Sequence, residues 1–218
     1  MRRVRRYRKR ALRSRRTRRG IFRRRRRYRR RSGSLSCKLT NVTQAAVPIS
    51  TTLVEGLSFK LTDFKEFNGL YKNFERVKVN RMRVTVYPQQ NVTDNQMGLC
   101  GGYCLLPWHR SDYASGLSFS DYLSSDKAKY FRSTQIGKQS YVPAIHVVNE
   151  SGTAAVSADV IKWRPEIYIN GLQKEVPMFY GGLFVHEPIP PIAQDSHAYY
   201  TFKMEVWVTF KNQTVISS

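Results

Sequence analysis

Residues 198–211, AYYTFKMEVWVTFK, alternate between apolar and polar side chains and decide the fold class. The apolar parity consists of Tyr200, Phe202, Met204, Val206, Val208 and Phe210, and the polar parity of Thr201, Lys203, Glu205, Thr209 and Lys211. Strict alternation over this length is typical of a long β-strand with one buried face. Tyr199 and Trp207 interrupt the polar parity, and a neighbouring subunit could cover them.

Two further segments show the same period of two. In residues 159–169, DVIKWRPEIYI, we expect four apolar side chains to point inward, namely Ile161, Trp163, Ile167 and Ile169, and four others to point outward, namely Lys162, Arg164, Glu166 and Tyr168. Pro165 has no N–H for a β-ladder, so we expect an edge strand there. In residues 74–88, FERVKVNRMRVTVYP, the apolar parity changes near residues 80–81, which predicts a β-bulge, and Pro88 ends the strand.

Residues 62–73, TDFKEFNGLYKN, predict the one helix of the chain, of about three turns. Asp63 and Glu66 have the spacing of a capping box, and Phe64, Phe67, Leu70 and Tyr71 follow a helical period. Further strands are expected at residues 34–48, 57–61, 98–106, 137–147 and 178–186, with long loops at 107–132, 149–158 and 187–196. Eight antiparallel strands with long connections favour an all-β, eight-stranded jelly roll.

The charge of the chain is concentrated at one end. Residues 1–31 contain 19 Arg and one Lys with no acidic residue, which accounts for 20 of the formal net charge of +23. The other 187 residues carry 18 basic and 15 acidic side chains, so they are close to neutral. We therefore divide the chain into a basic arm, residues 1–33, and a folded domain, residues 34–218.

The arm is predicted to be disordered when free and to bind a polyanion, since it has few apolar residues and many repelling charges. Arginine suits phosphate oxygens, and each neutralised phosphate releases a counterion. Three rings in the arm, Tyr7, Phe22 and Tyr28, could stack on unpaired bases. The predicted DNA-binding and nuclear-localisation residues are Arg2, Arg3, Arg5, Arg6, Arg8, Lys9, Arg10, Arg13, Arg15, Arg16, Arg18, Arg19, Arg23, Arg24, Arg25, Arg26, Arg27, Arg29, Arg30 and Arg31.

No catalytic motif accompanies these features. The sequence has no glycine fingerprint, Walker motif, nucleophile elbow or paired-histidine zinc helix, so we expect no enzyme, metal site or cofactor. The four histidines, His109, His146, His186 and His197, lie in different segments, and Cys37, Cys100 and Cys104 are expected to be reduced structural thiols. No apolar run approaches the roughly 18 residues of a membrane helix, so we expect no membrane insertion.

The order and spacing of four segments resemble the capsid proteins of circoviruses and cycloviruses. These segments are the opening MRRVRRYRKRALRSRRTRRG, LSFKLTDFKEF, FERVKVNRMRVTVYPQ and YYTFKMEVWVTF. The resemblance implies a T=1 icosahedral shell of sixty jelly-roll subunits around a circular single-stranded DNA genome, with the arm facing inward. Sixty arms would bring roughly 1,200 positive charges to a genome on the order of two thousand nucleotides.

The resemblance also implies host partners and places. The partners are nuclear import receptors that recognise the arm and a host cell-surface attachment factor, for which an anionic glycan is the candidate. The locations are the virion and the host cell nucleus. The alternative is a cellular nucleic-acid-binding protein of ribosomal type with a basic extension. A ribosomal body usually stays basic where it contacts RNA, whereas this one is nearly neutral.

Overall fold

The computed structural model describes residues 33–89, 101–110, 117–149, 158–169, 177–189 and 197–213. The chain divides into a unit of residues 1–34 and a unit of residues 35–218. The fold reported below is that of the second unit.

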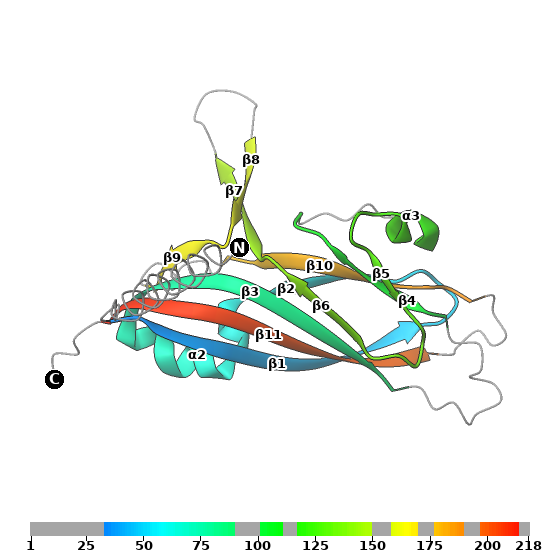
Figure 1. Ribbon diagram of the computed structural model, residues 1–218, viewed down its shortest axis with the longest axis horizontal. Helices are drawn as coiled ribbons and strands as arrows, with labels where there is room; N and C mark the ends of the chain where they lie inside the picture. Colours follow the sequence, from blue (N-terminus) through cyan, green and yellow to red (C-terminus); the bar gives the residue numbers. More distant parts are fainter. Residues whose placement is uncertain are drawn as a thin grey trace, which may run out of the picture. The chain divides into compact units, whose positions relative to one another are not determined.

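The first sheet contains the strand with the clearest sequence pattern at its centre. Its order is β1 (Leu35–Pro48), β11 (His197–Gln213), β3 (Phe74–Pro88) and β6 (Gly137–Tyr141), and β9 (Glu166–Tyr168) pairs with the other end of β3. All neighbours are antiparallel, and β1, β11 and β3 run side by side over their length (Figure 1). The apolar parity of β11 is buried as predicted, apart from half-buried Met204.

The second sheet is built around β10 (Phe179–His186). This strand pairs with β2 (Val54–Phe59) on one side and with β4 (Tyr103–Pro107) on the other, and β4 pairs with β5 (Lys129–Phe131). A hairpin of β7 (Ala144–Asn149) and β8 (Ala158–Trp163) joins this sheet at Tyr180 and projects from it (Figure 1).

The strand order is that of a jelly roll. Two four-stranded orders, β1-β11-β3-β6 and β2-β10-β4-β5, use eight strands, and β7, β8 and β9 lie in the connection between β6 and β10. The jelly-roll prediction is confirmed, but the assignment of strands needed correction. The three-residue β5 was missed, and predicted strand 137–147 divides into β6 and β7 at Pro143. The predicted loop 107–132 contains β5 and a short helix, α3 (Phe119–Leu123).

The segment predicted as one edge strand forms a corner between the sheets. It divides at Arg164, which has a positive φ of 47°, and Pro165; β8 lies at an edge of the second sheet and β9 at an edge of the first. The Arg164 N–H donates to the Pro143 carbonyl at 3.0 Å, and the Val79 N–H donates to the Pro165 carbonyl at 3.2 Å. Edge position is confirmed, whereas the inward orientation of Trp163 is wrong because the side chain is 53% exposed.

The predicted β-bulge lies at Asn80. Trp207 of β11 pairs with Arg81 and the next residue, Val208, pairs with Val79, so β3 has one extra residue there. The extra residue lets Val77 and Val79 on one side of the bulge, and Met82 and Val84 on the other, all reach the core.

The predicted helix is present but is shorter than expected. It consists of η2 (Leu61–Asp63), α2 (Lys65–Leu70) and η3 (Tyr71–Asn73). The capping box of Asp63 and Glu66 is wrong, because the Asp63 carboxylate accepts from the Lys60 N–H at 2.7 Å and α2 begins after Phe64. The backbone of Phe64 is extended and its side chain is fully buried, so the helical conformation is interrupted at this residue, between η2 and α2.

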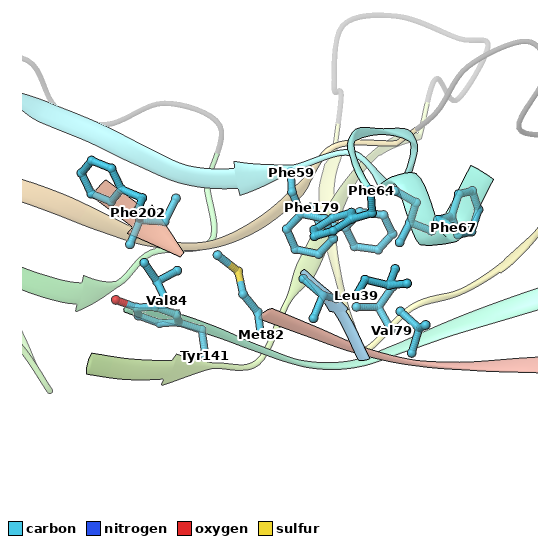
Figure 2. Packing of buried hydrophobic residues seen from close by; sticks show 14 of the residues in the cluster. Leu39, Phe59, Phe64, Phe67, Val79, Met82, Val84, Tyr141, Phe179 and Phe202 are labelled. Carbon is cyan, nitrogen blue, oxygen red and sulfur yellow. The ribbon is translucent and has the colours of Figure 1, made fainter. Parts of the chain in front are cut away.

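The core lies between the two sheets and beneath α2 (Figure 2). Phe59 and Phe179 of the second sheet stack with ring centroids 5.0 Å apart, and they face Leu39 and Met82 of the first (Figure 2). A second apolar cluster, built around Cys104, Leu106 and Tyr122, packs beneath α3. Within the described residues, no helix is long and apolar enough to cross a membrane.

Candidate nucleic-acid interface

All predicted site residues of the arm, which fall within residues 2–31, lie outside the described residues. The prediction for these twenty basic side chains and three rings is therefore untested. The described surface that resembles a nucleic-acid interface lies instead on the folded domain.

One face of the first sheet packs against the hydrophobic core. The other face is rich in basic side chains, and we call it the basic face. Directly paired residues of antiparallel strands point to the same side, so the register identifies its members. Its basic residues are Lys38, Arg76, Lys78, Arg81, Arg83, Lys138, Lys203 and Lys211, and its acidic residues are Glu166 and Glu205. The near-neutral total of the domain thus hides a local excess of positive charge.

Glu205 is the acidic centre of the basic face. Glu205 is 4% exposed, and its carboxylate accepts from Lys38 Nζ at 2.9 Å and is bound by the Arg83 guanidinium. Burial alone raises the pKa of Glu205, but the hydrogen bonds from Lys38 and Arg83 outweigh it and hold the pKa at about 2. The carboxylate therefore stays charged and fixes the position of Arg83.

Trp207 lies in the middle of the basic face, where it pairs with Lys38 of β1 and Arg81 of β3. The guanidinium carbons of Arg81 and Arg83 lie 5.3 and 5.0 Å from the centroid of its ring. These cation–π contacts hold both arginines above the sheet. The sequence suggested that a neighbouring subunit could cover Trp207; within the chain, Arg81 and Arg83 already lie over its ring.

At the far end of the face, Glu166 links two cations. Its carboxylate accepts from Lys211 Nζ at 2.5 Å and lies 3.8 Å from Arg76, whose guanidinium is 4.3 Å from the centre of the Tyr168 ring. The hydrogen bond from Lys211 lowers the pKa of Glu166. This end of the face is consequently better compensated than the end around Arg81.

A groove opens where edge strand β6 of the first sheet lies beside edge strand β5 of the second, and we call it the β5–β6 groove. It has a volume of about 450 Å³. Its lining residues are Arg81, Arg83, Pro107, Lys127, Lys129, Lys138, Gln139 and Ser140. Gln139 Nε2 donates to the Lys127 carbonyl at 3.1 Å, and Arg81 Nη2 donates to Ser140 Oγ at 2.7 Å. Hydrogen bonds from side chains therefore connect the segments that line the groove.

The other candidate residues do not form a site. Among the described residues, no three His, Cys, Asp or Glu side chains gather as metal ligands. Cys37 and Cys104 are free thiols, burial raises the pKa of Cys104 to about 12, and Cys100 lies outside the described residues. Of the histidines, His109 and His146 are neighbours, since the His146 ring contacts the His109 carbonyl, whereas His186 is buried in the core and His197 is exposed.

Sequence reasoning missed the residues of the groove. One signal was available in residues 74–88, where Arg76, Lys78, Arg81 and Arg83 occupy the outward positions on either side of the bulge. The approach of Lys127 and Lys129 to Lys138 had no local signal, because it depends on the pairing of β5 and β6 with different sheets.

Comparison with known proteins gives one consistent result. Residues 2–214 match the family model described as circovirus capsid protein. The chain is 36% identical over 185 residues to the capsid protein of Human associated cyclovirus 1, which covers 84% of each chain. Among solved structures, it is similar to the 60-mer BFDV capsid protein, with a TM-score of 0.64, 17% identity and coverage of 85% and 97% of the two chains. The decameric BFDV capsid protein is similar with a TM-score of 0.56, 17% identity and coverage of 82% and 99%.

Proposed function

The chain belongs to the circovirus capsid protein family, and on this premise we propose that sixty copies of it build a T=1 shell around single-stranded DNA. As a capsid protein it is a component of the virion and a structural protein rather than an enzyme. The predicted resemblance is thereby confirmed, and the ribosomal-type alternative loses its support. The observation that carries the proposal is the family match, which extends over both the arm and the jelly roll.

Two observations support a closed shell. A protein of similar fold, the BFDV capsid protein, has been solved as a 60-mer. The described surface also exposes more than half of several large apolar side chains, namely Val42, Ile136, Trp163, Tyr168 and Tyr199, which suit contacts between subunits. Sedimentation and electron microscopy of the purified chain should reveal closed particles of about 20 nm. A protein that stays monomeric at high concentration in every buffer tried would refute the shell.

DNA packaging is assigned to the arm. Its 20 positive charges and the absence of acidic residues in positions 1–31 support binding to phosphates without sequence reading. A synthetic peptide of residues 1–31 should bind oligothymidylate with a log–log salt slope of about −14 if all charges engage and about −7 if half do. Changing Arg24–Arg27 to Gln should flatten the slope by up to about three units, whereas Lys at these positions should largely keep it. A slope near zero would refute packaging by the arm.

Nuclear import is assigned to the same segment. Its two basic clusters, residues 2–19 and 23–31, are of the kind that import receptors recognise. A cytoplasmic reporter fused to residues 1–31 should accumulate in the nucleus, and changing the arginines of both clusters to Ser should abolish this. An even distribution of the unchanged fusion would exclude nuclear addressing and leave DNA binding unaffected.

Attachment to a host cell-surface factor is also part of the proposed function, and an anionic glycan is the candidate. Family membership supports it. Soluble sulfated glycan should reduce binding of assembled particles to cells. Unchanged binding over a wide range of competitor concentration would remove the glycan from the proposal.

A further inference from the structure

The β5–β6 groove carries positive charge that its own surroundings do not neutralise. Arg83 is engaged by Glu205, and Lys127 lies 3.7 Å from Asp126 in a largely exposed pair that contributes little. Within the described part of the chain, no ion pair links Arg81, Lys129 or Lys138 to a carboxylate. Like charges that line one concave surface raise its potential, so an anion bound there would relieve their repulsion.

The groove also has the geometry of an oxyanion site. Arg81 is held from two sides, by the Ser140 hydroxyl and the Trp207 ring, so its planar fork loses little freedom when it binds a phosphate. The volume of about 450 Å³ lies within the range of roughly 300–1,000 Å³ typical of ligand sites. Beside it, Arg81 and Arg83 lie over the half-buried Trp207 ring, so the two guanidinium groups and the ring together form a flat platform for an unpaired base, which a single strand can supply and a duplex cannot.

The register of the sheet connects the groove with the root of the arm. Residues 1–34 attach to β1 at Leu35, and Lys38, Trp207 and Arg81 form a row across the sheet only three residues further along β1. Three residues of a strand span about 10 Å. A polyanion bound near the end of the arm can therefore continue along the basic face to the groove, which favours nucleic acid over a cell-surface ligand.

We propose that the β5–β6 groove, with Trp207 beside it, is a second binding site for the backbone of single-stranded nucleic acid. The site belongs to the folded domain and is separate from the arm. The inference rests on the proposed packaging function, which it extends from the arm to the domain. Lys127, Lys129 and Lys138 are all exposed, so they can be changed without disturbing the core.

The first test locates contacts in the intact chain. An oligothymidylate of about 30 nucleotides with 5-iodouracil substitutions is bound, irradiated and digested with a protease that cuts after glutamate. Because the first glutamate is Glu55 and the last is Glu205, the arm falls in fragment 1–55 and Trp207 in fragment 206–218. We expect crosslinks in both. Crosslinks confined to 1–55 would overturn the inference, whereas crosslinks confined to 206–218 would support it and refute packaging by the arm.

The second test compares two triple variants of equal charge. Lys127→Gln, Lys129→Gln and Lys138→Gln together should reduce the 206–218 crosslink at least about tenfold. They should also flatten the salt slope by about two units, since three phosphates contribute about 0.7 each. The control changes three exposed lysines around α2, Lys60→Gln, Lys65→Gln and Lys72→Gln, and should leave both readouts as in the unchanged chain.

Three results would contradict the groove as a nucleic-acid site. The first is an equal slope for the two triple variants. The second is a groove variant that binds oligothymidylate normally but no longer forms particles, which would make the groove a contact between subunits. The third is a groove triple variant that no longer binds sulfated glycan but keeps its DNA crosslink, which would make the groove an attachment site.

Discussion

Acidification should destabilise the folded subunit through His186. The side chain lies at the end of β10, fully buried, with its ring centroid 5.9 Å from that of Tyr200. Burial lowers its pKa to about 4 from the ordinary 6.5, and the neighbouring carboxylate of Glu187 opposes this only in part. The unfolded chain therefore takes up a proton on His186 at a higher pH than the folded chain does.

The sign and size of the effect follow from these two pKa values. Above pH 6.5 the histidine is neutral in both states and costs nothing. Between pH 6.5 and 4 only the unfolded state is protonated, so the free energy of unfolding falls by about 1.4 kcal/mol per pH unit, or about 3 kcal/mol in all. Below pH 4 the loss levels off, because the folded state is protonated as well.

Urea denaturation of unassembled subunits at a series of pH values would measure this loss. His186→Leu should remove about 3 kcal/mol of the difference between pH 7 and pH 4, whereas Val42→Ala, at an exposed position without a titratable group, should leave the difference unchanged. NMR titration of the His186 ring gives the pKa independently of stability. A pKa above about 6, or a His186→Leu profile that coincides with the unchanged chain, would refute the reasoning.

Three other perturbations have defined outcomes. Phe179→Ala, which removes a fully buried ring stacked 5.0 Å from Phe59, should lower the free energy of unfolding by about 3–5 kcal/mol in urea denaturation, while exposed Val42→Ala should change it by no more than about 0.5 kcal/mol. Glu205→Gln should lower the free energy of unfolding by about 1–3 kcal/mol at pH 7. It should also abolish the loss of stability between pH 4.5 and about 2, because that loss comes from protonating Glu205. An unchanged dependence of stability on pH in this range would contradict the assigned ion pairs. Deletion of residues 1–31 should leave shell formation intact but yield particles without a packaged genome, with far less nucleic acid than the unchanged chain because only the β5–β6 groove remains to bind it; the ratio of absorbance at 260 and 280 nm would report this. Particles filled as in the unchanged chain would exclude the arm as the main packaging element.

Local patterns in the sequence predicted the long strands well, because a strand with one buried face repeats every two residues. The alternation of residues 198–211 and the change of parity near Asn80 both reappear in the paired strands. Short elements lacked such a pattern: three residues of β5 are too few to show a period. For α3 a signal existed and was not used, since Ser118 and Asp121 form the capping box that their spacing of three allows.

The candidate site on the domain could not be predicted because it is assembled from distant segments. Glu205 was expected to point to solvent, yet it is buried because Lys38 and Arg83 meet it from 167 and 122 residues away. Trp163 was assigned to the core by parity, but the corner at Arg164 turns the strand and exposes the ring. In both cases the deciding interaction depends on which strands are neighbours.

The corner between β8 and β9 has a mechanical consequence. Within about two residues the chain leaves an edge of one sheet and joins an edge of the other, so the backbone itself connects the two sheets at this corner. The Arg164 N–H donates to the carbonyl of Pro143, which lies between β6 of the first sheet and β7 of the second, so a backbone hydrogen bond joins two places where the chain crosses between the sheets. Any sliding of one sheet past the other would therefore stretch this hydrogen bond.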